Sequence, residues 1–406
     1  MLNSIAERYV RLVLQIGQHD ADYVDAFYGN PAWRPSGSPR PLEKLVADVQ
    51  DIRETLVDLT LTDIIDDMTG LRLEYLERQT SAAEARLDML AGRTLSFDAE
   101  SEQLYDAVAP RRTEDDFRRT LDELDRVLPG RGELVDRYTA FRQRFLIDRA
   151  RLDRVFRRAI DECRERTRTH LPLPGSESFS IEYVTGQSWS AYNWYQGNFT
   201  SVIQLNTDLP ITIDRAVDLA AHEGYPGHHV YQCLLEQALV RGRGWPEFTV
   251  YPLFSPQSLV SEGTANFGVD VAFPAEERLA FERDHLYELA GLDPDSASAF
   301  QTSQRLVDDL AYAGTEAARR YLDGDLDRDG AVEFLMRWSM SPRDRARQRI
   351  AFFDRYRSYV INYTLGKELV SAYIERRGGT PDRPAVRWTE FGKLLASPRL
   401  PSGLSE

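Results

Sequence analysis

Residues 217–234 read Val-Asp-Leu-Ala-Ala-His-Glu-Gly-Tyr-Pro-Gly-His-His-Val-Tyr-Gln-Cys-Leu and hold three of the six histidines in the chain. A histidine followed by a glutamate on a helix with apolar periodicity is typical of the H-E-x-x-H zinc motif, in which histidines at i and i+4 share one face. Here position i+4 is Pro226, and the next histidines are His228 and His229. On an undistorted helix His222 and His229 would lie about 10 Å apart along the axis, too far to bind one ion.

Pro226 is expected to break the helix, and this break can bring a second histidine close to His222. Proline removes a helical N–H and clashes with the preceding turn, and the glycines on either side of Tyr225-Pro226 tolerate unusual backbone geometry. With a two-residue excursion at Tyr225-Pro226, His228 takes the place of the second histidine of the motif. The stretch therefore predicts a metal site that uses His222 and His228. A three-residue excursion would bring in His229 instead.

The segment His-Glu-x-x-Pro-Gly-His-His resembles the signature of the domain-of-unknown-function 885 family, helical proteins similar to zinc metallopeptidases. A second block of that family, Glu-Gly-x-Ala, is similar to the four residues from Glu262, and the resemblance implies that Glu262 is a third zinc ligand. A third block ends in Tyr-x-x-Gly and is similar to the segment from Tyr363 to Gly366, without the Pro-Gly-Gln that usually precedes it. The resemblance covers residues 175–376 and implies one zinc ion per chain.

A more distant resemblance concerns the choice of the second histidine. Carboxypeptidase Taq-like enzymes read His-Glu-x-Gly-His followed by Ala-Leu-Tyr. With two residues inserted after the glutamate, the segment from Gly227 to Tyr231 falls onto Gly-His-Ala-Leu-Tyr, and this alignment gives the ligand position to His228.

The chain is predicted to be mainly α, and the resemblance implies a zincin-like helical metallopeptidase fold. Residues 1–171 form a helical N-terminal region, and residues 172–406 form a zinc-binding catalytic region that ends in further helices, including 296–322 and 343–376. Interruptions of the first region are expected near four positions: Thr60, Gly92, Pro110 and Pro129.

Residues 178–206 carry β-branched and aromatic side chains in short runs separated by Thr-Gly and Gly-Asn, which predicts a small antiparallel sheet beside the metal-binding helix. A sheet edge can pair with an extended peptide by main-chain hydrogen bonds. Tyr192 and Asn206 are therefore candidate substrate contacts. For Tyr192 the alternative is packing in the core. Five arginines lie within 345–357. Because a guanidinium binds a carboxylate through two hydrogen bonds, Arg357 is a further substrate-binding candidate.

The chain of 406 residues is 42% hydrophobic, enough for a substantial core. Its net charge of −15 makes nucleic acid a poor partner. No apolar run approaches the roughly 20 residues that span a bilayer, and two cysteines make no disulfide framework. Because residues 1–8 do not read as an export signal, we expect a cytoplasmic protein with no membrane partner. The sequence carries no signal for an oligomeric state.

Glu223 is adjacent to His222 but turned about 100° from it on a helix, so its carboxylate can reach a zinc-activated water without binding the metal. We expect Glu223 to act as general base and to pass the proton to the leaving amine. The oxyanion of the tetrahedral intermediate also needs a hydrogen-bond donor. The candidates are Tyr363, from the family's Tyr-x-x-Gly, and whichever of His228 and His229 does not bind zinc. With His228 as ligand, the donor is His229.

These parts predict a zinc-dependent hydrolase that acts on peptide bonds of short peptides. One alternative is a zinc hydrolase of a non-peptide amide or ester, which shares every catalytic part and differs only in its pocket. The other is a non-catalytic binding protein that keeps a structural metal. A structural site has no use for a carboxylate beside its first ligand, so Glu223 favours an enzyme.

Overall fold

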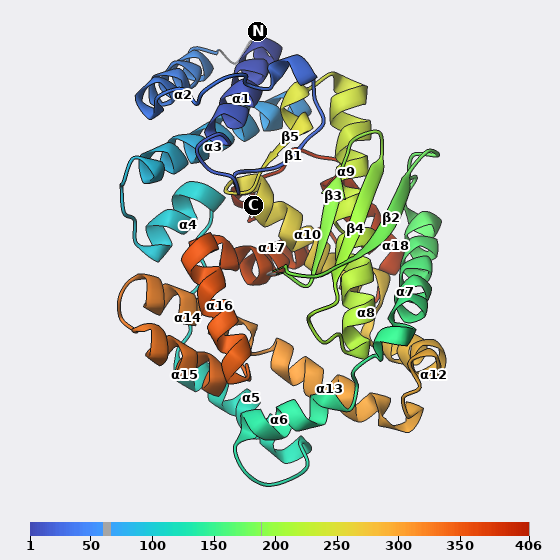
Figure 1. Ribbon diagram of the computed structural model, residues 1–406. Helices are drawn as coiled ribbons and strands as arrows, with labels where there is room; N and C mark the ends of the chain where they lie inside the picture. The colour runs from blue at the N-terminus through green and yellow to red at the C-terminus, as the bar shows by residue number, and fades with distance from the viewer. Residues whose placement is uncertain (60–65, 188, 406) are drawn as a thin grey trace.

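The computed structural model describes residues 1–59, 66–187 and 189–405, and most of that part of the chain is helical (Figure 1). The predicted interruption at Thr60 lies outside the described residues. Up to residue 171 the helices are α1 (Leu2–Ile16), α2 (Leu42–Val57), α3 (Asp67–Leu90), α4 (Phe97–Tyr105), α5 (Glu114–Val127), α6 (Leu134–Gln143) and α7 (Arg149–His170).

Local chemistry sets where these helices begin and end. The side chains of Asp66 and Ser96 each accept a hydrogen bond from the backbone N–H three residues on, at the first turns of α3 and α4. Such caps satisfy N–H groups that have no partner within the helix. Helix α3 stops before Gly92, whose φ of 102° favours glycine, and α5 stops before Pro129.

The second half of the chain places the metal-binding stretch among many short helices. They are α8 (Ile213–Leu219), a π-helical turn η3 (Ala220–Gly224), α9 (His228–Leu235), η4 (Glu236–Arg241), α10 (Pro256–Ala272), α11 (Ala275–Phe281), α12 (Tyr287–Ala290), α13 (Ala297–Asp308), α14 (Ala311–Leu322), α15 (Arg328–Trp338), α16 (Arg343–Tyr356), α17 (Ile361–Arg376), α18 (Pro384–Leu395) and α19 (Pro401–Leu404). The segments expected as single helices over 296–322 and 343–376 are each broken. The second break falls at Arg357, where φ is 50°.

The sheet beside the metal-binding helices differs from the antiparallel one expected. Its strands β2 (Ser178–Val184), β4 (Thr200–Asn206) and β3 (Ala191–Tyr195) lie in that order, with β2 parallel to β4 and only β3 antiparallel to it. The chain turns tightly between β3 and β4 through Gly197, Asn198 and Phe199, which all have positive φ. β3, which follows β2 in the chain after a longer connection, lies on the far side of β4, and β2 runs in the direction of β4.

Asn206, expected to contact substrate, supports that longer connection instead. Its side chain is fully buried and donates hydrogen bonds to the backbone oxygens of Gln187 and Trp189, each at 2.9 Å. A second, two-stranded sheet pairs β1 (Val24–Phe27) with β5 (Val250–Pro252) in antiparallel fashion and ties the N-terminal helices to the second half of the chain.

One hydrophobic core runs through both predicted regions, with buried side chains from Ile5 to Leu404. Buried polar contacts also cross between the regions: Arg72 on α3 pairs with Glu247, and Tyr75 donates to Gln257 at 2.7 Å. Helices α10 and α17 lie side by side at the centre of the molecule (Figure 1). Within the described residues, none of the helices combines the length and apolar character that crossing a membrane requires.

Candidate metal centre

The metal-binding stretch folds as two helices that meet at a break. Helix α8 widens into the π-turn η3, which carries His222, and a new helix begins at His228 after Tyr225-Pro226-Gly227. The N–H of Gly227 bonds to the backbone oxygen of Ala221 at 2.9 Å, folding the break back over the π-turn. A Cβ atom on Gly227 would fall 1.9 Å from the backbone oxygen of His222, so only glycine fits there.

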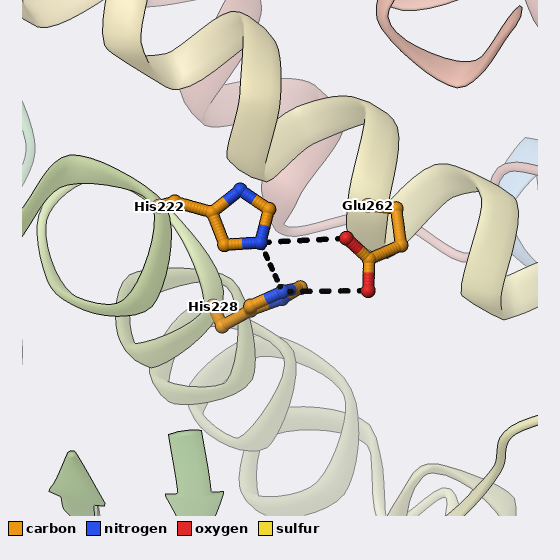
Figure 2. Close-up of side chains that lie close together, drawn as sticks. All are labelled: His222, His228 and Glu262. Carbon is orange, nitrogen blue, oxygen red and sulfur yellow. Dashed lines mark hydrogen bonds and ion pairs between the residues drawn. The ribbon is translucent and has the colours of Figure 1, made fainter. Parts of the chain in front are cut away.

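This break brings His228 beside His222, and Glu262 on α10 completes a group of three (Figure 2). The Nε2 atoms of the two histidines are 3.1 Å apart. Oε2 of Glu262 lies 3.4 Å from Nε2 of His222, and Oε1 lies 3.7 Å from Nε2 of His228. Ligand atoms around a tetrahedral zinc, each about 2.0–2.2 Å from the metal, are separated by roughly 3.3 Å. The spacing therefore fits one ion.

The immediate surroundings also fit a cation between these side chains. Oε2 of Glu262 is buried and has no hydrogen-bond partner, whereas Oε1 accepts a hydrogen bond of 2.8 Å from the hydroxyl of Tyr359. Ser261 Oγ lies 3.1 Å from Nδ1 of His228 and orients that ring. Burial lowers the pKa of His228 to about 4, so the neutral imidazole that binds metal is the stable form.

Glu223 lies next to this group without belonging to it. Its side chain is buried and lines the same cavity. Burial raises its pKa to about 7, with His222 acting to lower it and Glu262 to raise it further. The backbone oxygen of Glu223 accepts a hydrogen bond of 2.7 Å from the side chain of Asn193, which fixes the π-turn to strand β3. A carboxylate with a pKa near neutrality is suited to general base catalysis.

His229 points into the core rather than toward the group of three, because it follows His228 round the helix. It is fully buried, with Nδ1 2.8 Å from Ser201 Oγ and Nε2 3.0 Å from Oε2 of Glu177. The same carboxylate oxygen accepts a hydrogen bond of 2.5 Å from Tyr225. This network anchors both sides of the break to the sheet, so His229 supports the site from behind and does not line the cavity.

The group of three opens into a cavity of about 1770 Å³. Tyr363, a predicted catalytic residue, lines this cavity and is 38% exposed. Tyr192, a predicted substrate contact, lines it too, and its hydroxyl donates to Asp25. Arg357, the third predicted substrate contact, does not: its side chain pairs with Glu100 on α4.

Several residues that line the cavity were not predicted from the sequence. Tyr359 holds Glu262, Asp25 accepts from Tyr192, and Arg215 precedes His222 by two helical turns. Asp25 comes from the N-terminal region, for which no motif was recognised. The five arginines within 345–357 predicted a substrate contact, but the sequence did not show which of them line the cavity.

Comparisons with known proteins support the fold and give no family. No protein-family model matches the sequence, and no curated protein matches it. The chain is similar to a "putative lipoprotein" from Colwellia psychrerythraea, with a TM-score of 0.53 and 16% identity over 89% of this chain. It spans 65% of the length of that protein, and the likeness shows a shared fold.

Two further solved structures are similar over most of the chain. A "putative lipoprotein of unknown function" from Shewanella oneidensis gives a TM-score of 0.43 and 13% identity, over 87% of this chain and 72% of that one. BsuCP gives a TM-score of 0.44 and 11% identity, over 97% of this chain and 87% of that one.

Proposed function

We propose that the protein is a zinc-dependent hydrolase that cleaves peptide bonds in short peptides, with zinc held by His222, His228 and Glu262. The observation that carries the proposal is the convergence of these three side chains beside Glu223, which shares their cavity but is not one of the group. Structural zinc sites are closed by four protein ligands, whereas catalytic sites use three and leave a position for water. The resemblance to the domain-of-unknown-function 885 family supports the same assignment.

Zinc bound there supplies a Lewis acid and lowers the pKa of water toward neutrality. Glu223 accepts the proton of the attacking water and transfers it to the leaving nitrogen. The hydroxyl of Tyr363 donates a hydrogen bond to the developing oxyanion. Tyr359 keeps Glu262 in place through its hydrogen bond to Oε1.

The cavity supports a peptide of a few residues as substrate. At about 1770 Å³ it exceeds the roughly 300–1,000 Å³ typical of small-molecule pockets. Tyr192 and Asn193 of strand β3 contribute to its wall, and Tyr192 offers an aromatic ring. We propose Tyr192 as a substrate contact on this basis.

The experiment that tests the proposal is incubation of the zinc-loaded protein with a library of short peptides, followed by mass spectrometry with and without a chelator. We expect cleavage that stops on chelation and returns when zinc is added back. Cleavage of amide or ester compounds alone, with every peptide left intact, would assign the site to a non-peptide hydrolase. A protein that binds zinc and cleaves neither would be a binding protein with a structural metal.

A further inference from the structure

The arginines at 345–357 differ in what they contact. Three of them have carboxylate partners, in the pairs Arg347–Asp344, Arg355–Asp22 and Arg357–Glu100. The other two, Arg345 and Arg349, line the cavity that holds the metal site, as does the paired Arg355. Among the residues that the structure describes, no carboxylate lies within 4.0 Å of either guanidinium. Two cations of this helix therefore face the cavity without a counter-charge.

Arg349 is held in place by neutral groups. Its Nη1 donates to the hydroxyls of Ser339, at 2.5 Å, and Ser341, at 3.3 Å. On another side it packs against Gly314, where a Cβ atom would fall 1.8 Å from Nη2 of the arginine. Gly314 thus makes room for the guanidinium, and the hydroxyls orient it while leaving its charge unbalanced.

Two weakly paired arginines from other helices, Arg142 and Arg215, also line the cavity. Arg142 on α6 donates to Thr212 Oγ1 at 3.0 Å, and its Nε is buried with no acceptor. Arg215 on α8 lies 3.4 Å from a carboxylate oxygen of Asp218, whose other oxygen is paired more closely with Arg278 at 2.8 Å. Four weakly paired guanidinium groups thus line the cavity from three helices, with one loosely held carboxylate among their partners. Two further arginines of the cavity, Arg278 and Arg355, are each closely paired with an aspartate.

The four charges act on one another. Partial removal from water, together with Arg215 and Arg142, lowers the pKa of Arg345. Burial and the charge of Arg345 lower the pKa of Arg349 to about 10. This mutual repulsion persists although the chain has a net charge of −15. An anion bound among the arginines would relieve it.

We propose that Arg142, Arg215, Arg345 and Arg349 bind a carboxylate of the substrate while its scissile bond lies at the metal site. The position of the scissile bond at the metal site rests on the proposed function. The inference adds that the substrates are anionic peptides. Guanidinium groups recognise carboxylates through paired, charge-assisted hydrogen bonds. A peptide offers that group either as its C-terminal carboxylate or as the side chain of Asp or Glu.

The test is a calorimetric titration of the zinc-loaded protein with three compounds that need no turnover. N-acetylphenylalanine carries a terminal carboxylate, N-acetylphenylalanine amide carries none, and N-acetylglutamate α-amide carries a side-chain carboxylate. We expect at least one acid to bind ten times more tightly than the phenylalanine amide. The acid that does so identifies the source of the carboxylate. Equal binding of all three compounds would overturn the proposal.

Variants separate the arginines from zinc, which also attracts carboxylates. The double variant Arg345→Ala/Arg349→Ala is expected to lose the preference for the acid while keeping its zinc content and its affinity for the amide. Arg347→Ala, on the same helix but paired with Asp344, is the matched control and should keep the preference. A preference that survives in the double variant would contradict the proposal. If the double variant does not fold, Arg345→Ala and Arg345→Glu alone must weaken acid binding, because Arg345 is exposed to the cavity.

The binding test and the hydrolysis test fail separately. A protein that binds the acid through these arginines and cleaves no peptide would keep the anion site and overturn the proposed function. A protein that cleaves peptides but binds acid and amide equally would keep the hydrolase and overturn the anion site.

Discussion

Gly263 of α10 and Gly366 of α17 lie so close that a Cβ atom on Gly263 would fall 2.4 Å from the backbone oxygen of Gly366. A Cβ on Gly366 would fall 2.7 Å from the backbone oxygen of Leu259. Both distances are shorter than real Cβ contacts. Because Glu262 precedes Gly263 on the same helix, this crossing of two glycines sets where its carboxylate meets the histidines.

The first prediction is that Gly366→Ala weakens zinc binding. The added methyl group must push α10 and α17 apart, and overpacking of this kind costs about 1–3 kcal/mol of stability. Displacement of Glu262 is expected to lower zinc affinity at least about tenfold, as loss of a supporting contact does at other metal sites. Competition with a chelator measures the affinity. Gly175→Ala is the control, since no atom lies within 4 Å of its Cβ position, and unchanged zinc affinity in Gly366→Ala would contradict the prediction.

The second prediction concerns the buried ion pair that joins the N-terminal helices to the rest of the chain. Arg72 donates to both carboxylate oxygens of Glu247, at 2.5 and 2.9 Å, and both side chains are buried. Arg72→Ala leaves that carboxylate buried without a partner, so the free energy of unfolding should fall by about 3–5 kcal/mol. Arg53→Ala removes a more exposed pair with Glu84 and should cost about 1 kcal/mol or less. Urea denaturation measures both, and similar small losses would refute the prediction.

The third prediction is a pH dependence that originates at Glu177. Burial would raise the pKa of its carboxyl, but hydrogen bonds from His229, Tyr225 and Arg164 hold that pKa well below its usual range. Since the pKa in the folded protein is lower than the value of about 4.3 in the unfolded chain, the carboxylate stabilises the fold above that pH. This contribution is lost as the pH falls through the folded value.

Glu177→Gln is accordingly expected to lower the free energy of unfolding by roughly 2–4 kcal/mol at pH 7. The deficit relative to the unmodified protein should shrink below about pH 4. Urea unfolding at pH 7 and at about pH 3.5 checks both statements. Glu165→Gln, on the exposed face of α7, is the control and should change stability by about 0.5 kcal/mol or less. A deficit that stays constant with pH would argue against the assignment.

The fourth prediction separates two adjacent histidines. His228→Ala removes a member of the metal group and should leave the purified protein with little zinc. His229→Ala removes a side chain that contacts Ser201 and Glu177 instead, so we expect about one zinc per chain together with a lower melting temperature. Elemental analysis distinguishes the two variants. A metal-free His229→Ala protein beside a zinc-replete His228→Ala would reverse the roles.

Features that depend on their own segment could be predicted from the sequence. Proline and glycine act on neighbouring backbone, so the break after Glu223 follows from local geometry. The choice of His228 over His229 needed the resemblance to carboxypeptidase Taq-like enzymes, because local geometry allowed either. The helical character of the chain follows from periodicity for the same reason. Glu262 lies forty residues after His222 in the sequence, and only the resemblance identified it as a candidate ligand.

Features that depend on distant partners could not be predicted. The direction of β2 is set by how the chain passes β4, which no residue of β2 encodes. Arg357 pairs with Glu100, 257 residues earlier in the chain, and does not line the cavity, whereas Arg345 and Arg349 do. The sequence shows that several arginines lie close together along the chain, but only the fold decides which of them are paired with carboxylates.

The most direct test of the account is the zinc content of Glu223→Gln, measured on the same sample as its rate of peptide cleavage. Glu223 is assigned as the base and not as a ligand, so the variant should keep about one zinc per chain and lose at least about 100-fold in rate. Its fold should be intact, because the replacement has the same shape. Loss of zinc together with activity would make Glu223 a ligand, and full activity with zinc bound would remove it from the chemistry; either result would contradict the account.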